Sequence, residues 1–113
     1  SAVEPEIKET EEQPTVSELE IAYSNSPTVK AGGGYKKFTL KSRIDGKLVD
    51  CTEDIEWSVD FVNGDSSKLE TSISGNIFKV KCKNDYSLIG KTFTITAKTK
   101  YNSTSLVVEV TSQ

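Results

Sequence analysis

The chain has 113 residues with a formal net charge of −3, and 35% of its residues are hydrophobic, 8% aromatic and 27% charged. This length leaves room for one domain, because a second independent core would have too few residues to fold. There is no His and there are only two Cys, which excludes Ser–His and Cys–His nucleophiles as well as Cys₄ and Cys₃His zinc sites. The composition disfavours an enzyme and predicts neither a cofactor nor a metal site.

The charge is unevenly distributed along the chain. Residues 1–20 carry seven acids and one base, whereas the rest of the chain carries the remaining ten acids and thirteen bases. An acidic segment with few large apolar residues cannot offset the entropy cost of ordering it. We therefore interpret residues 1–16 as a disordered acidic linker or tail, and residues 17–113 as one folded domain. An acidic docking tail is the alternative.

Apolar residues recur at every second position in the first half of the domain, which is the period of a half-buried β-strand. Turn-forming residues separate the apolar runs; Asp45-Gly46, a strong hairpin dipeptide, is the clearest example. No run approaches the roughly 20 apolar residues that span a bilayer. We expect strands at residues 19–23, 35–44 and 55–62, and short stubs at 28–30 and 48–49.

The second half of the domain repeats this alternation, with strands expected at residues 69–73, 78–82, 93–98 and 106–110. No segment shows an apolar stripe at helical spacing, and there is no room for helices between the strands. About seven short strands with frequent turns predict an all-β antiparallel sandwich of two sheets. The residues expected in its core are Phe38, Leu40, Trp57, Val59, Phe78, Val80, Phe93, Ile95 and Val108.

Several segments resemble a known family. Residues 75–82 and 85–97 are similar to the C-terminal half of bacterial immunoglobulin-like (Ig-like) modules of the BIG2-like type, and the Trp strand at 55–59 and the segment 29–39 match their earlier parts. The variants attached to structural proteins of phages of Gram-positive hosts are the most similar. The resemblance covers residues 17–112. It implies an Ig-like sandwich that serves as an accessory or spacer domain, often with weak adhesion to cell-surface glycans.

The function that this resemblance implies is a non-catalytic accessory or spacer module of a phage virion structural protein, tethered to the particle through the N-terminal linker. Its expected location is the virion. The alternative is a glycan-adhesive module of a secreted or surface-bound bacterial protein. That alternative predicts saccharide binding through an exposed aromatic residue, for which Tyr23, Tyr35 and Tyr101 are the candidates.

A possible binding surface is marked by Lys79, Lys81 and Lys83, which alternate with the inward residues of their strand, together with Tyr101. We expect the lysines to form a solvated face that also guards a sheet edge against pairing. The alternative is a patch for an anionic partner, such as teichoic acid or another virion protein. Nucleic acid is not expected, because interleaved aromatic residues and a strongly basic balance are missing.

Two further expectations concern single side chains. Cys82 follows the inward phase of its strand, which predicts a buried free thiol, although a Cys51–Cys82 disulfide remains open. The antibody-type disulfide of Ig domains is not expected, because these cysteines do not flank the Trp in facing strands. Tyr86 precedes the penultimate strand, where Ig-like sandwiches place a Tyr whose hydroxyl bonds to the backbone.

Overall fold

The computed structural model describes residues 16–112, and the predicted acidic linker lies outside them apart from Val16. The described chain is almost entirely β-structure, with two short 3₁₀ turns and no helix long and apolar enough to cross a membrane. The elements are β1 (Val16–Ala22), β2 (Thr28–Lys30), β3 (Lys36–Ile44), β4 (Lys47–Asp50), β5 (Glu56–Asp60), η2 (Ser66–Lys68), β6 (Leu69–Ser74), β7 (Ile77–Cys82), η3 (Tyr86–Leu88), β8 (Thr92–Lys98) and β9 (Ser103–Thr111).

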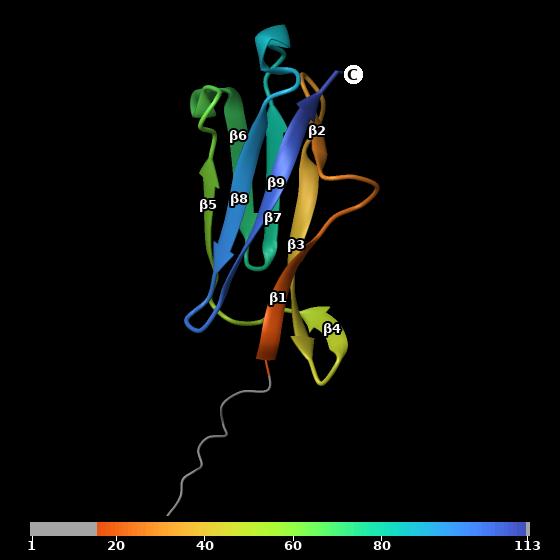
Figure 1. Cartoon of the computed structure of the whole chain (residues 1–113), viewed down its shortest axis with the longest axis vertical. Coiled ribbons are helices and arrows are strands. Elements are labelled where there is room, and N and C mark those ends of the chain that lie inside the picture. The colour runs from red at the N-terminus through yellow and green to blue at the C-terminus, as the bar shows by residue number, and fades with distance from the viewer. Residues whose placement is uncertain (1–15, 113) are drawn as a thin grey trace, which may run out of the picture.

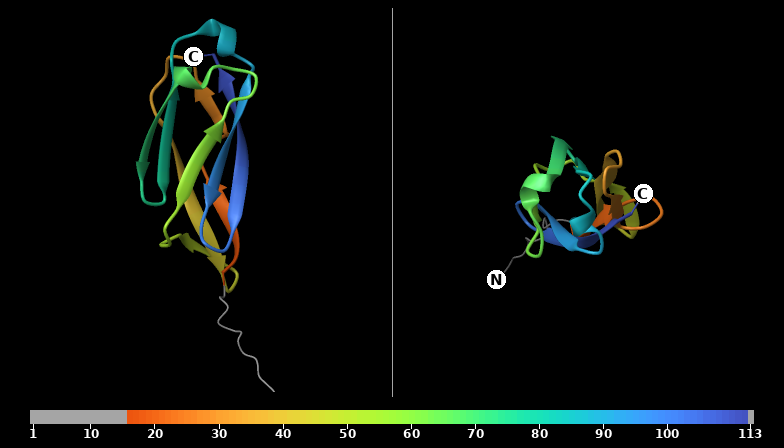
Figure 2. Two further views of the ribbon diagram at one scale, coloured as in Figure 1. Left: turned by 90° about the vertical axis from the view of Figure 1, so that its left-hand side faces the viewer. Right: turned by 90° about the horizontal axis from the view of Figure 1, so that it is seen from above.

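The strands form two sheets that face each other (Figures 1 and 2). One sheet has the order β1-β3-β7-β6, with β4 also paired to β3, and the other has the order β2-β9-β8-β5. All pairs of strands are antiparallel except β2 with β9. In the letters used for Ig domains, the first sheet is A-B-E-D and the second contains G-F-C.

This strand order makes the molecule an Ig-like β-sandwich and confirms the predicted fold class. The described chain has nine strands rather than about seven, because the two expected stubs are both paired. β2 continues the first strand on the opposite sheet beside β9, and β4 forms a hairpin with β3. Asp45 and Gly46 both have positive φ in that hairpin (51° and 81°), as a two-residue type I′ turn requires.

The core lies between the two sheets and is built from the inward residues of both. Trp57 on β5 stacks on Phe78 of the facing β7, with ring centroids 5.1 Å apart, and its Nε1 donates to the carbonyl of Gly75 at 3.1 Å. Val59 is partly buried against this core. The other residues expected in the core are all buried: Phe38, Leu40, Val80, Phe93, Ile95 and Val108.

The described chain enters the sandwich at one end and leaves it at the other. β1 begins beside the β3–β4 hairpin, and β9 ends at the opposite end, next to β2 (Figure 1). β9 alone spans nine residues, or about 30 Å of extended chain. The two ends of the described chain are therefore separated along the long axis of the domain.

Candidate functional site

The lysines singled out from the sequence belong to an interior strand. β7 pairs with β3 on one side and with β6 on the other, so the expectation that these lysines guard a sheet edge is wrong. Lys79 and Lys81 lie on the outer face of the β1-β3-β7-β6 sheet, while Lys83 follows the strand and donates its backbone N–H to the carbonyl of Lys68 at 2.9 Å. Lys79 and Lys81 therefore face solvent from the middle of a sheet.

Most charges on this outer face are paired. Arg43 Nε lies 3.1 Å from a carboxylate oxygen of Glu18, and the Lys41 ammonium lies 2.7 Å from Asp50. The outward acids come from the neighbouring strands β1 and β4. Because these pairs are exposed, each contributes little to stability, about 0–1 kcal/mol. Together they neutralise the part of the outer face near the β3–β4 hairpin.

The exception is a row in the middle of the face, formed by Lys37 on β3 and Lys79 on β7. The two residues are directly opposite each other in the register, so their Cβ atoms are about 4.5–5.5 Å apart. Neither ammonium has an acidic partner among the described residues. Like charges directly opposite are destabilising, so this row is an electrostatic anomaly in an otherwise balanced face.

The register that creates this row is set by the core. Phe38 and Phe78 are also directly opposite each other, one position further along, and both are buried. Since side chains alternate between the faces of a sheet, the pairing of these two inward rings necessarily brings Lys37 and Lys79 together on the outer face. Packing in the core thus fixes the like-charge pair.

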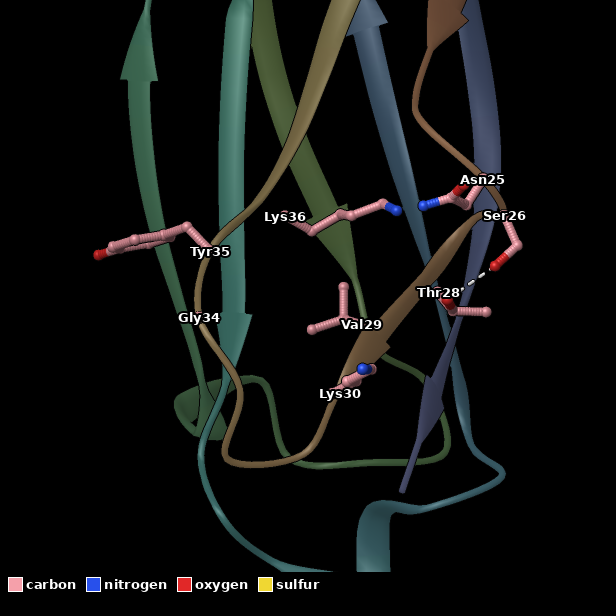
Figure 3. Close-up of a pocket in the computed structure, with 8 residues that line it drawn as sticks. All are labelled: Asn25, Ser26, Thr28, Val29, Lys30, Gly34, Tyr35 and Lys36. Atoms are coloured by element: carbon pink, nitrogen blue, oxygen red, sulfur yellow. Dashed lines mark hydrogen bonds between the residues drawn. The ribbon is translucent and has the colours of Figure 1, made fainter. Parts of the chain in front are cut away.

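In the neighbouring row of the face, the positive charge of Lys81 has an acidic partner. Lys81 lies 3.6 Å from Glu70 on β6 and 4.9 Å above the ring of Tyr35, which precedes β3. Figure 3 shows that the Tyr35 ring points away from Lys36, whose ammonium is directed towards the Asn25 side chain. Lys36 donates to the Ser24 carbonyl at 2.7 Å. Tyr35 therefore lines the hollow drawn in Figure 3 together with Lys36, and its ring also lies beneath the Lys81 ammonium of the outer face.

Tyr101 does not join the lysines. It lies in the turn between β8 and β9 and has the ammonium of Lys100 5.6 Å above its ring. Ala31 forms a β-bridge with Cys82 and donates its N–H to the carbonyl of Thr111, the last residue of β9. Lys83, which follows Cys82, therefore lies near the end of the molecule where β9 finishes. The length of β9, about 30 Å, separates the two positions. The surface proposed from the sequence is therefore two separate regions.

The tyrosines considered for saccharide stacking also do not form a common platform. Tyr23 packs against the core ring of Phe38 at 6.3 Å, while Tyr35 and Tyr101 each have a different lysine above the ring. Tyr86 is 79% exposed, so the predicted hydroxyl bond to the backbone is wrong. The inward position of that turn is taken by Leu88, which is buried.

Cys82 is a buried free thiol, which confirms the prediction; the Cys51–Cys82 disulfide that the sequence left open is not formed, and Cys51 is also buried and free. Cys51 donates its N–H to Leu40, which in turn donates to Asn76 beside the start of β7. Cys82 is six positions further along, or about 20 Å, whereas a disulfide needs Cα atoms about 4.4–6.8 Å apart. Burial, and to a lesser extent the charge of Asp85, raise the pKa of the Cys82 thiol.

Two matching turns lie at the end of the sandwich near Lys83. Asp65 caps η2 by accepting from the hydroxyl and backbone N–H of Ser67, and Asp85 caps η3 in the same way through Ser87, with distances of 2.7 and 3.0 Å in both turns. These hydrogen bonds lower the pKa of both carboxyl groups. In the part of the chain that the structure describes, no three acidic or cysteine side chains converge as metal ligands.

The surface hollows are shallow and do not gather reactive groups. One of about 240 Å³ lies beside the lysine row, where β1 ends, and is lined in part by Tyr23, Lys37 and Lys41. Lys37 is not among the residues singled out from the sequence. The signal that could have singled it out is the pair Lys37-Phe38 and Phe78-Lys79, whose mirrored order places the lysines opposite each other once the phenylalanines pair.

Comparisons with known proteins do not identify a family for the chain. No family model and no curated protein matches the chain. Among solved structures, the chain is similar to titin M4 in a trigonal crystal form, with 14% identity and a TM-score of 0.49 over 87% of this chain and 98% of that one. A likeness this distant carries no information about function. The strand order itself makes the described chain an Ig-like domain.

Proposed function

We propose that this chain is a non-catalytic accessory or spacer module of a larger structural protein, carried on a phage virion and contributing weak adhesion to the host cell surface. The observation that carries the proposal is the course of the chain from one end of the sandwich to the other (Figure 1). A domain threaded in this way holds apart the segments joined to its two ends. Its rigidity comes from the continuous core between the sheets.

The non-catalytic part of the proposal is supported by the chemistry of the side chains. The sequence has no His, the commonest general base. Both thiols are buried, which suits packing better than nucleophilic attack. The acids on the outer face contact lysines and an arginine, and Glu70, which lines a hollow, is paired with Lys81 there.

The virion setting is supported by the resemblance of residues 75–82 and 85–97 to Ig-like modules of phage structural proteins. Fold alone does not separate this setting from a bacterial surface protein, because Ig-like sandwiches serve many unrelated tasks. The two settings differ in where the folded module is displayed. Immunogold electron microscopy with an antibody raised against the folded domain makes that distinction.

The antibody is applied to intact virions and to intact cells of the source. We expect gold particles on the outside of intact virions. Labelling that requires disruption of the particle would place the domain in the capsid floor or tail tube and contradict the accessory role. Labelling of uninfected cells alone would replace the virion setting with the bacterial surface. An unrelated Ig-like domain, added as a competitor, controls for antibody specificity.

A further inference from the structure

We propose that the Lys37–Lys79 row on the outer face of the β1-β3-β7-β6 sheet binds a phosphate-bearing polymer, whose anionic groups supply the counter-charge that residues 16–112 do not provide. The inference deepens the proposed adhesive role, on which it rests, by naming the contact surface and the chemical class of the partner. Its starting point is the contrast between this row and the charges around it.

Every neighbouring cation of the face has an anion near it. Lys81 contacts Glu70, Lys41 contacts Asp50, and Arg43 contacts Glu18. Lys37 and Lys79 have no such contact within the described chain. An anion between them would remove a like-charge repulsion as well as add an attraction, so this position gains more from an anion than any other on the face.

The geometry of the row suits a tetrahedral oxyanion. Two ammonium groups on strands about 4.8 Å apart can each donate to a different oxygen of one phosphate, and lysine binds phosphate as a point charge with three donors. Ser72 of β6 is opposite Lys79 and exposed on the same row. Its hydroxyl extends the set of donors across a third strand.

A polymer fits the face better than an isolated phosphate ion. Exposed charges in water hold a single ion weakly, so useful affinity requires several contacts along one chain. Lys41 continues the basic side of β3 from Lys37, four residues away, or roughly 13 Å along the strand. A linear chain of phosphates lying along β3 meets the free row first and the paired cations next.

The test is a titration of the ¹⁵N-labelled domain, followed by NMR, with inorganic polyphosphate, inorganic phosphate and poly-glutamate as three separate probes. We expect polyphosphate to shift the amide signals of Lys37, Lys79 and Ser72, with affinity falling as salt is added. Inorganic phosphate should bind at least about tenfold more weakly, because it lacks multivalency. Poly-glutamate should not reproduce the pattern.

Two double variants make the test specific. Lys37→Gln/Lys79→Gln should weaken polyphosphate binding about tenfold. Lys98→Gln/Lys100→Gln removes the same charge near the far end of the other sheet and should leave binding within about twofold. A third variant, Lys79→Glu, places an opposite charge beside Lys37; it should melt at a higher temperature than the wild type and lose binding.

Each of the other outcomes would overturn the inference. Equal weakening by both double variants would mean that polyphosphate senses overall charge and not the row. Equal binding of poly-glutamate would contradict the choice of phosphate, and equal binding of inorganic phosphate would contradict the choice of a polymer. Absence of shifts in the row would make the lysine pair a by-product of Phe38–Phe78 packing. None of these results bears on where the domain is mounted, which the antibody experiment decides.

Discussion

The two faces of β7 come from one alternating stretch of six residues, yet they differ in what determines them. On the inner face, Phe78, Val80 and Cys82 are each at most 2% exposed, and each packs into a core shared by both sheets. On the outer face, Lys79 and Lys81 have opposite surroundings, one facing a lysine and the other a glutamate. The alternating sequence of the strand therefore determines which of its residues are buried, whereas the residues on the adjacent strands determine the electrostatic surroundings of its lysines.

The largest expected effect is on the inner face. Phe78→Ala removes the ring that stacks on Trp57 across the sandwich and should lower the free energy of unfolding by about 3–5 kcal/mol, because a cavity is left behind. The matched control is Ile73→Ala on β6, directly opposite Phe78 but 55% exposed, which should cost less than about 0.5 kcal/mol. Urea unfolding measures both; similar losses would contradict the assignment of the core.

The contrast between the faces also shows what could be predicted from the sequence. The period of two identified Phe38, Trp57 and Phe78 as inward residues, because burial depends on one strand at a time. The partners of Lys79 could not be identified, since they depend on which strands flank β7 and in what register. The same gap produced the incorrect edge assignment, because the sequence does not show that β6 covers that side.

The error at Tyr86 and the disulfide question that the sequence left open have a similar cause. Tyr86 was assigned by its position relative to the next strand, but the 3₁₀ turn directs Leu88 inward instead, and a turn of three residues has no period that predicts its inner side. Whether Cys51 and Cys82 can form a disulfide depends on how far Cys51 lies from the end of β7. That distance follows from the hydrogen bonds of Leu40, which no local pattern reveals.

A second test of the inner face concerns Cys82. Its raised pKa means that the folded state favours the neutral thiol, so this contribution to stability is complete below the ordinary pKa of about 9.0 and is lost as the pH rises towards the folded pKa. Wild-type stability should therefore fall between about pH 8.5 and 10 more steeply than that of Cys82→Ala. Chemical unfolding across this range tests it.

The control for this experiment is a polar isostere. Cys82→Ser, which leaves a buried hydroxyl in place of the thiol, should cost about 1–3 kcal/mol at pH 7. If Cys82→Ala and the wild type show the same slope, the buried thiol does not contribute to the pH dependence.

The loop after β7 belongs to neither face, and we expect substitutions in it to have a smaller effect on stability. Hydrogen bonds from Ser87, followed by the charge of Lys68, lower the pKa of Asp85. Their stabilising contribution is present above the ordinary carboxyl pKa of 3.8 and is lost as the pH falls through the folded value. Asp85→Asn should therefore be less stable than the wild type at pH 7, and this difference should shrink towards pH 2.

Asp65→Asn is the matched variant, because the Asp65 carboxylate accepts the same two hydrogen bonds from Ser67. It should show the same direction of change. Asp85 also lies 3.5 Å from Lys68, so Asp85→Asn is expected to have the larger effect of the two. A difference between wild type and variant that does not depend on pH would mean that the carboxylate charge has no role in the caps.

The smallest effects are on the outer face, and there the sign is informative. Lys81→Gln removes the contacts with Glu70 and Tyr35 and should destabilise the domain by up to about 1 kcal/mol. Lys79→Gln relieves the repulsion with Lys37 and should stabilise it by a few tenths of a kcal/mol. Both variants lose one positive charge from the same strand and face, two residues apart, so overall charge cannot explain opposite signs. Thermal unfolding at low salt resolves the two shifts, and added salt should bring them together as the charges are screened. Shifts of equal sign would mean that the two lysines of β7 share one environment, and that the face has no unbalanced row.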